Sequence, residues 1–97
     1  MKLTEVQRRH LRGRAHRLKP CVHVGMAGVT PAVLAEISGA LGHHELLKVK
    51  IRAADRQVRD AAVSALVEQT KSTLVARIGN VAILYRPDPE NPHLTLP

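Results

Sequence analysis

Hydrophobic and basic residues alternate without interruption from Leu47 to Arg52. A period of two places alternate side chains on opposite faces of an extended chain, so the pattern predicts a half-buried strand. Its apolar face points to a core, and its outward face carries Lys48, Lys50 and Arg52. Three cations in a row are either a solvated strand face or part of a binding surface, and the strand alone leaves both interpretations open.

Three other segments show the helical period, at about residues 5–18, 31–41 and 56–70. The first follows the capping-box pattern Thr4-x-x-Gln7 and ends before Pro20. The second begins at Pro31, with Thr30 as its N-cap. The third can be capped by Asp55.

Short apolar runs at residues 21–24, 74–78 and 81–85 complete the pattern. The last two are joined by Gly79-Asn80 and read as a hairpin. The order α-β-α-β-α-β-β predicts a two-layer α/β fold, with a four-stranded mixed sheet packed with helices. We expect one domain over residues 1–97, in which 87–97 form a proline-rich tail without regular structure.

The turn Gly25-Met26-Ala27-Gly28 joins the first predicted strand to the second predicted helix. Two glycines three apart permit a sharp turn and the close approach of another backbone. Such a turn before a helix N-terminus presents backbone N–H groups and a positive dipole end, which suit a phosphate. Taken alone, the spacing is a weak signal and favours a plain turn.

Positive charge is concentrated at one end of this 97-residue chain, whose net charge is +7. Residues 1–19 contain seven Lys or Arg and one acidic residue, whereas the other 78 contain eight basic and seven acidic residues. The basic side chains gather on an arc of the first helix beside its apolar stripe. This asymmetry points to a polyanionic partner, first a nucleic acid and second an anionic membrane surface.

Other classes of function find little support in the sequence. No apolar segment is long enough to span a membrane. No catalytic arrangement of side chains can be argued, so we expect neither an enzyme nor a cofactor. His43 and His44 are predicted to follow a helix on extended chain. Adjacent side chains on an extended chain point to opposite faces, so we expect no metal site there. The single cysteine, Cys21, is predicted to be buried in the first strand of a cytoplasmic protein. Tyr85 is the one aromatic ring and is expected to pack, so base stacking cannot be the main source of affinity.

Five segments resemble the CRM family, named for chloroplast RNA splicing and ribosome maturation, and its stand-alone bacterial type in particular. They are residues 18–20, 25–28, 33–37, 43–51 and 84–87, within a resemblance that covers 2–87. The resemblance implies an RNA-binding module that is similar in fold to the C-terminal domain of translation initiation factor 3. It also implies association with precursors of the large ribosomal subunit, and it places Gly25 and Gly28 in the RNA-contacting surface.

The hypothesis is therefore a monomeric RNA-binding protein of ribosome assembly that contacts phosphates. Met26 and Ala27 bring no charge, so backbone amides act at the turn while neighbouring elements supply cations. The predicted RNA-binding residues are Gly25, Met26, Ala27, Gly28 and Thr30 at the turn, Arg8, Arg9, Arg12 and Lys19 near the first helix, and Lys48, Lys50 and Arg52 on the strand. Two alternatives remain at this point, a protein–protein adaptor on assembly particles and a small DNA-binding protein.

Overall fold

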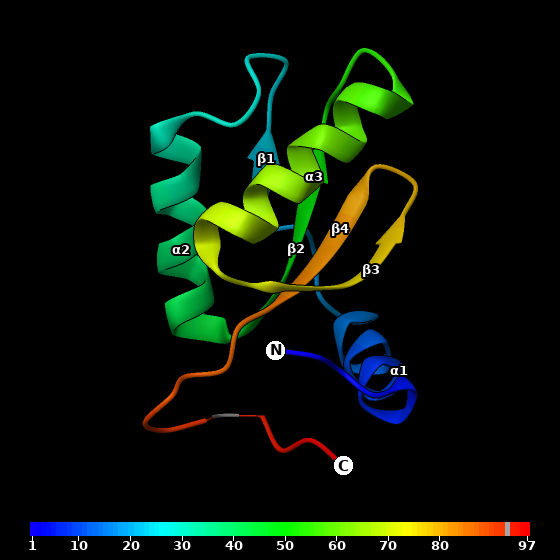
Figure 1. Ribbon diagram of the computed structural model, residues 1–97, viewed down its shortest axis with the longest axis vertical. Helices are drawn as coiled ribbons and strands as arrows, with labels where there is room; N and C mark the ends of the chain where they lie inside the picture. Colours follow the sequence, from blue (N-terminus) through cyan, green and yellow to red (C-terminus); the bar gives the residue numbers. More distant parts are fainter. Residues whose placement is uncertain (93) are drawn as a thin grey trace.

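Three helices and four strands follow one another in the predicted order. The computed structural model describes residues 1–92 and 94–97. The elements are α1 (Glu5–Ala15), β1 (Val22–Val24), α2 (Pro31–His44), β2 (Leu46–Ile51), α3 (Arg56–Thr70), β3 (Thr73–Ile78) and β4 (Val81–Tyr85) (Figure 1). The strands form one sheet in the order β1-β2-β4-β3, in which β1 and β2 are parallel and the other pairs antiparallel. The predicted α/β class and mixed sheet are confirmed.

The sheet is covered by helices on both faces, which the two-layer prediction did not anticipate. On one face, Leu47, Val49 and Ile51 of β2 pack with the apolar sides of α2 and α3. On the other face, Leu46 of β2 packs against Leu11 of α1. The buried residues that join them in this second cluster are Leu3, Ala15, Val75, Ile83 and Tyr85. Because α1 covers only one end of this face, the cations of β2 remain accessible beyond it.

Two helix ends differ from the sequence prediction. The helix α1 ends at Ala15, three residues early, because the chain tightens there: the amide of His16 is shared between the carbonyls of Arg12 and Gly13. The helix α2 continues to His44 and ends at Glu45, which adopts a positive φ of 64°. His43 and His44 therefore lie in the last helical turn and not on extended chain.

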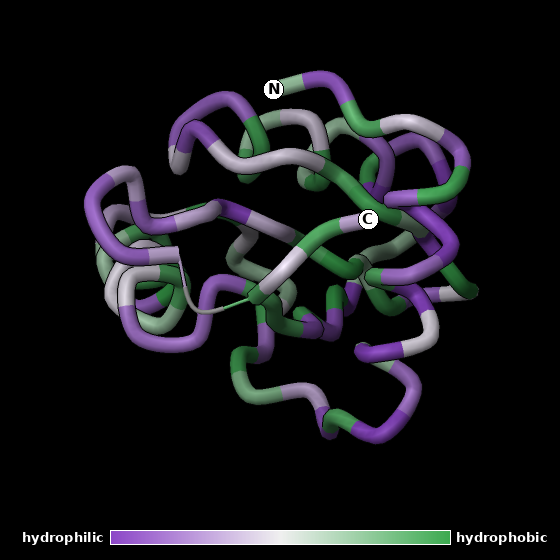
Figure 2. The backbone as a smooth tube through the Cα atoms, turned by 90° about the horizontal axis from the view of Figure 1, so that it is seen from below, coloured by the Kyte–Doolittle hydropathy of each residue, from purple (hydrophilic) through white to green (hydrophobic). Residues whose placement is uncertain are grey.

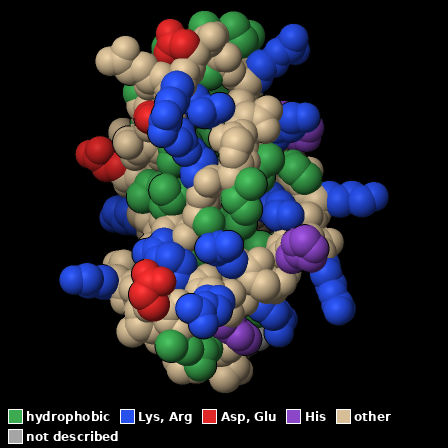
Figure 3. Space-filling view, turned by 90° about the vertical axis from the view of Figure 1, so that its right-hand side faces the viewer, with side chains coloured by type: hydrophobic (Ala, Val, Ile, Leu, Met, Phe, Trp, Pro, Cys, Tyr) green, Lys and Arg blue, Asp and Glu red, His purple; other side chains and the backbone are tan. Residues whose placement is uncertain are grey.

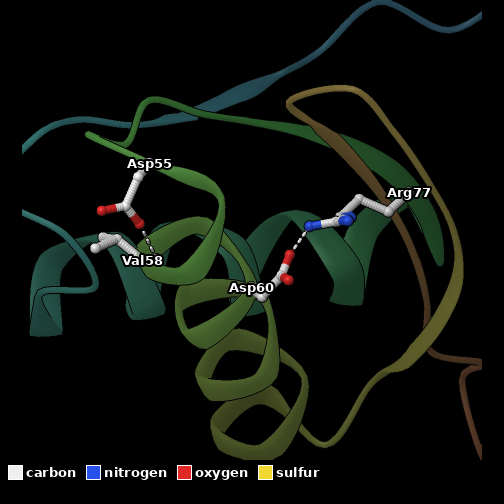
Figure 4. A network of polar contacts seen from close by, with 4 residues as sticks. All are labelled: Asp55, Val58, Asp60 and Arg77. Carbon is white, nitrogen blue, oxygen red and sulfur yellow. Dashed lines mark hydrogen bonds and ion pairs between the residues drawn. The ribbon is translucent and has the colours of Figure 1, made fainter.

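Side-chain caps and one ion pair fix how the helices start and dock. The capping box of Thr4 and Gln7 is present, as predicted. Asp55 caps α3 by accepting a hydrogen bond of 2.9 Å from the amide of Val58 (Figure 4). One turn further, Asp60 forms an ion pair with Arg77 of β3, which ties α3 to the edge of the sheet (Figure 4).

The predictions for Cys21 and Tyr85 had opposite outcomes. Tyr85 is buried, as expected, and burial raises the pKa of its hydroxyl, with a further contribution from the charge of Glu45. The prediction of a buried Cys21 is wrong: Cys21 precedes β1 and is exposed, since the strand begins with Val22 facing the core. Partial desolvation nevertheless raises the pKa of its thiol.

The proline-rich tail is held against the domain by a buried carboxylate. Glu45 is fully buried, and its carboxylate accepts hydrogen bonds from the amides of Asp88 and Leu94. Its carbonyl also accepts one from Arg86, at 2.8 Å. Leu94 and Leu96 pack against the α1 cluster, so both chain ends lie beside α1 (Figures 1 and 2).

Removal of this carboxylate should loosen the tail. We expect Glu45→Ala to lower the free energy of unfolding by about 1–3 kcal/mol, because it leaves two half-buried amide donors without their acceptor. Urea denaturation measures the change. Glu36→Ala removes an exposed acid from the same helix and should change stability by less than about 0.5 kcal/mol. Equal effects of the two substitutions would contradict the role given to Glu45.

Candidate nucleic-acid interface

The glycine turn links β1 to α2 as a closed, exposed loop. The amide of Gly28 donates a 3.0 Å hydrogen bond to the carbonyl of Gly25. Gly28 has a φ of 84°, a conformation that other residues rarely adopt, whereas Gly25 does not have a positive φ and nothing lies within 4 Å of the place its Cβ would occupy. The fold thus explains glycine at position 28 and leaves glycine at position 25 without a structural reason.

Between the two glycines the side chains are exposed, whereas Thr30 after them caps α2. Met26 is 63% exposed, and Ala27 is exposed beside it. The hydroxyl oxygen of Thr30 accepts a 3.1 Å hydrogen bond from the amide of Val33, and so caps α2 as predicted. The cap accounts for Thr30 structurally, and contact between Thr30 and RNA remains a prediction.

A hollow of about 400 Å³ lies directly beside the glycine turn. In the parallel pairing of β1 and β2, His23 lies opposite Lys50, and both point away from the α2–α3 side. Arg52 reaches the same place because its amide donates to the carbonyl of Val24 at 2.8 Å, one residue before the turn. Asn80 of the neighbouring hairpin completes the lining.

A second hollow, of about 460 Å³, lies between α1 and the same face of the sheet. Arg9, Arg12 and His16 line it from α1, and Lys48 lines it from β2. Lys48 and Lys50 are two residues apart on one strand, so their Cα atoms are separated by only about 7 Å. The two hollows therefore adjoin along β2.

The basic and histidine side chains of the two hollows lie on one face of the sheet, and we call them together the basic strip. It comprises Arg9, Arg12, His16, His23, Lys48, Lys50 and Arg52. The structure describes all eight acidic residues of the chain, and none lines either hollow. Figure 3 views the side of the molecule that carries α1 and the hairpin: Lys and Arg side chains are spread over both halves of this face, whereas the acidic side chains visible in it lie in the left half.

Two of the predicted basic residues lie outside the strip. Arg8 points to the sheet, where its Nη1 donates to the carbonyls of Leu74 at 2.6 Å and Val75 at 2.7 Å, next to an irregularity in the pairing of β3 and β4. Lys19 lines a different hollow, of about 330 Å³, with Cys21 and Leu94 among its neighbours. The structure thus gives Arg8 a bracing role and separates Lys19 from the strip, and RNA contact by either remains a prediction.

The sequence patterns did not select His16, His23 or Asn80 as candidate site residues. His23 could have been found, because it alternates with the apolar Val22 and Val24 and so faces outward on its strand. Within the described residues, no group of three or more His, Cys, Asp or Glu is placed to hold a metal ion. The strip offers guanidinium, ammonium, imidazole and backbone groups, which can bind phosphate oxygens.

Known proteins share this architecture and sequence. The CRS1 / YhbY (CRM) domain matches residues 3–86. The chain belongs to the CRM domain family. Its relatives include an "RNA-binding protein" of Haemophilus influenzae, 47% identical over 88 residues that cover 91% of this chain and 89% of that protein. A second is the "Probable RNA-binding protein YqeI" of Bacillus subtilis, 38% identical over 98% of this chain and 99% of the relative.

A solved structure supports the same assignment. A Staphylococcus aureus protein to which RNA binding is ascribed superposes on this CRM domain with a TM-score of 0.84 and 32% sequence identity. The alignment covers 99% of this chain and all of that protein. None of the described helices of this CRM domain is long and apolar enough to cross a membrane.

The different surroundings of Arg8 and Arg9 can be tested by the free energy of unfolding of their alanine variants. We expect Arg8→Ala to lower the free energy of unfolding by about 1.5–3 kcal/mol, because two half-buried carbonyls lose a charged donor. Arg9→Ala, one position along the same helix, should change it by less than about 0.5 kcal/mol. Urea denaturation of the pair is the measurement, and a larger loss for Arg9→Ala would refute the division.

Proposed function

We propose that this CRM domain binds RNA through phosphate contacts along the basic strip and the glycine turn. The target we propose is precursor RNA of the large ribosomal subunit, bound in the cytoplasm by a monomer during ribosome assembly. The ribosomal part of the proposal comes from the family resemblance. The binding mode comes from the strip itself, which is the observation that carries the proposal.

Three features of the strip favour a polyanion over other partners. Its lysines and arginines come from α1, from β2 and from the residue that follows β2, and with His23 of β1 they form one path and not a scatter of surface charges. Within the described residues no acidic side chain is paired with them, so their charge is available to a ligand. The path ends at the glycine turn, where Gly25 lines the hollow without a side chain and so permits close approach of a ligand to the backbone. The names of the relatives agree with RNA as the ligand.

Phosphate binding through the strip predicts a steep salt dependence. If about five phosphates are neutralised, log K should fall against log[salt] with a slope of about −3.5 to −4.5. Lys50→Gln should weaken RNA binding and make the slope shallower by about 0.7–0.9. Fluorescence anisotropy with labelled ribosomal RNA fragments, measured over a salt series, gives both values.

Lys71→Gln is the matched control, because Lys71 is an exposed lysine at the end of α3, outside the strip. It should leave the slope unchanged. A flat salt response of the wild-type protein would refute phosphate binding, and equal losses in the two variants would refute the strip as its location. Duplex DNA as competitor distinguishes RNA binding from general affinity for nucleic acids.

The glycine turn can be tested separately from the cations. We expect Gly25→Val to weaken RNA binding severalfold while the free energy of unfolding changes by less than about 1 kcal/mol, because position 25 has free space and no positive φ. Gly39→Val serves as a second variant, since Gly39 is exposed on α2 away from the turn. It should retain RNA affinity. Unchanged affinity in Gly25→Val would show that the turn does not approach the ligand. Gly28 is unsuited to this test, because its positive φ makes any side chain strained.

A further inference from the structure

One stripe of α1 combines basic and histidine side chains with a glycine. Arg9, Arg12, Gly13 and His16 follow the spacing i, i+3, i+4, i+7, which places them in one stripe along the helix. All four line the hollow between α1 and the sheet. The buried Leu11 and Ala15 lie on a different stripe of α1 and pack against the sheet. Three of the residues above the hollow are cationic or titratable, and the fourth has no side chain.

Gly13 has no explanation within the fold. Glycine is among the poorest helix formers, and Gly13 lies in the last turn of the 11-residue helix α1, two residues before its end. Its φ is not positive, and no atom lies within 4 Å of the place its Cβ would occupy. The absent side chain leaves a flat stretch of helix backbone beside the hollow, where a ligand can lie close.

The floor of the hollow is apolar. Ile78 and Ile83 line it from the β3–β4 hairpin, and Ile78 is 60% exposed although it is a large hydrophobic residue. Figure 3 shows exposed hydrophobic side chains in the middle of this face, with Lys and Arg on both sides. A phosphate group gains nothing from such a floor. A flat heterocycle does, because its faces are apolar while its attached phosphates need cations.

The walls supply what an unstacked base requires. Unpaired RNA bases are held by stacking on aromatic rings, including histidine, and on arginine guanidinium planes. The hollow presents the imidazole of His16 and the guanidinium groups of Arg9 and Arg12. Lys48 lies at the border with the other half of the strip, where the flanking phosphates would continue towards Lys50. The volume of about 460 Å³ falls within the range of small-ligand sites.

We propose that this hollow receives one unpaired nucleotide of the bound RNA, so that the domain prefers RNA with a bulged or looped-out base to an uninterrupted duplex. The inference rests on the proposed function, since it describes how the same strip selects among RNAs. A single stacked nucleotide is also compatible with the scarcity of aromatic residues, because phosphates still supply most of the affinity. The cationic rim argues against an apolar side chain of a partner protein as the occupant.

The test compares two RNAs that differ by one nucleotide. One is a 20-base-pair duplex, and the other is the same duplex with a single-adenosine bulge at its centre. We expect wild-type protein to bind the bulged RNA about tenfold more tightly, in line with the contribution of one stacked base. Gly13→Leu places a side chain in the hollow and should weaken binding of the bulged RNA more than binding of the duplex, and so remove this preference. Ile78→Thr keeps a β-branched residue in the strand, removes apolar floor and should reduce the preference in part.

Gly39→Leu is the matched control, because Gly39 is an exposed helical glycine with free space around it, outside the hollow. It should keep the preference. The denaturation midpoint of Gly13→Leu should equal or exceed that of the wild type, since leucine favours the helix more than glycine does.

The outcomes separate the two proposals. Equal affinity of the wild type for both RNAs would overturn the inference and leave phosphate binding intact. Equal losses of affinity for both RNAs in Gly13→Leu would also overturn it, because the hollow would then contact only the phosphate backbone of the RNA and no base. Failure of the wild type to bind either RNA would overturn the proposed function as well.

Discussion

The alternation of side chains along β2 is the constraint on which the rest of the structure depends. Leu47, Val49 and Ile51 are nearly inaccessible and anchor the core beneath α2 and α3. Because a strand places successive residues on opposite faces, this burial forces Lys48 and Lys50 to the other side. A shift of one residue would bury both lysines without partners, at a cost that the domain could not sustain. The stability of the core therefore fixes the position of the cations.

The parallel pairing of β1 with β2 brings the residues of the candidate site together. The register places His23 beside Lys50 and brings the end of β1, with its glycine turn, level with the end of β2. The helix α1 then packs on the same face as the lysines, but only over the end that Leu46 and Tyr85 make apolar. Half of one sheet face is thus left uncovered between a cationic helix and an exposed turn. Both hollows of the basic strip result from this incomplete cover.

Sequence patterns predicted the elements well where one local rule determined them. The capping residues Thr4, Thr30 and Asp55, the Gly79-Asn80 turn and the strand period of β2 all depend on neighbours in the chain. The sequence could not show which face of the sheet each helix covers, since that depends on apolar residues such as Ile83 and Val75 from distant strands. Nor could it foresee that Glu45, buried beneath the tail, would continue α2 past Gly42 and then end it. For the candidate site, charge selected α1 and β2, which the fold brings to one face of the sheet, but it could not separate Arg8 from Arg9, whose side chains meet different surroundings one residue apart.

The three glycines of this region differ in what the fold requires of them. Gly28 is required by its backbone conformation, so its presence says nothing about a ligand. Gly25 and Gly13 are different, because each could carry a side chain without strain or collision. Gly13 also weakens its helix, and natural sequences tend to give up stability where a site needs access. Both of these unexplained glycines border the basic strip, one at each hollow. A ligand that passes along the strip close to the backbone at both places accounts for the two glycines and the cations together.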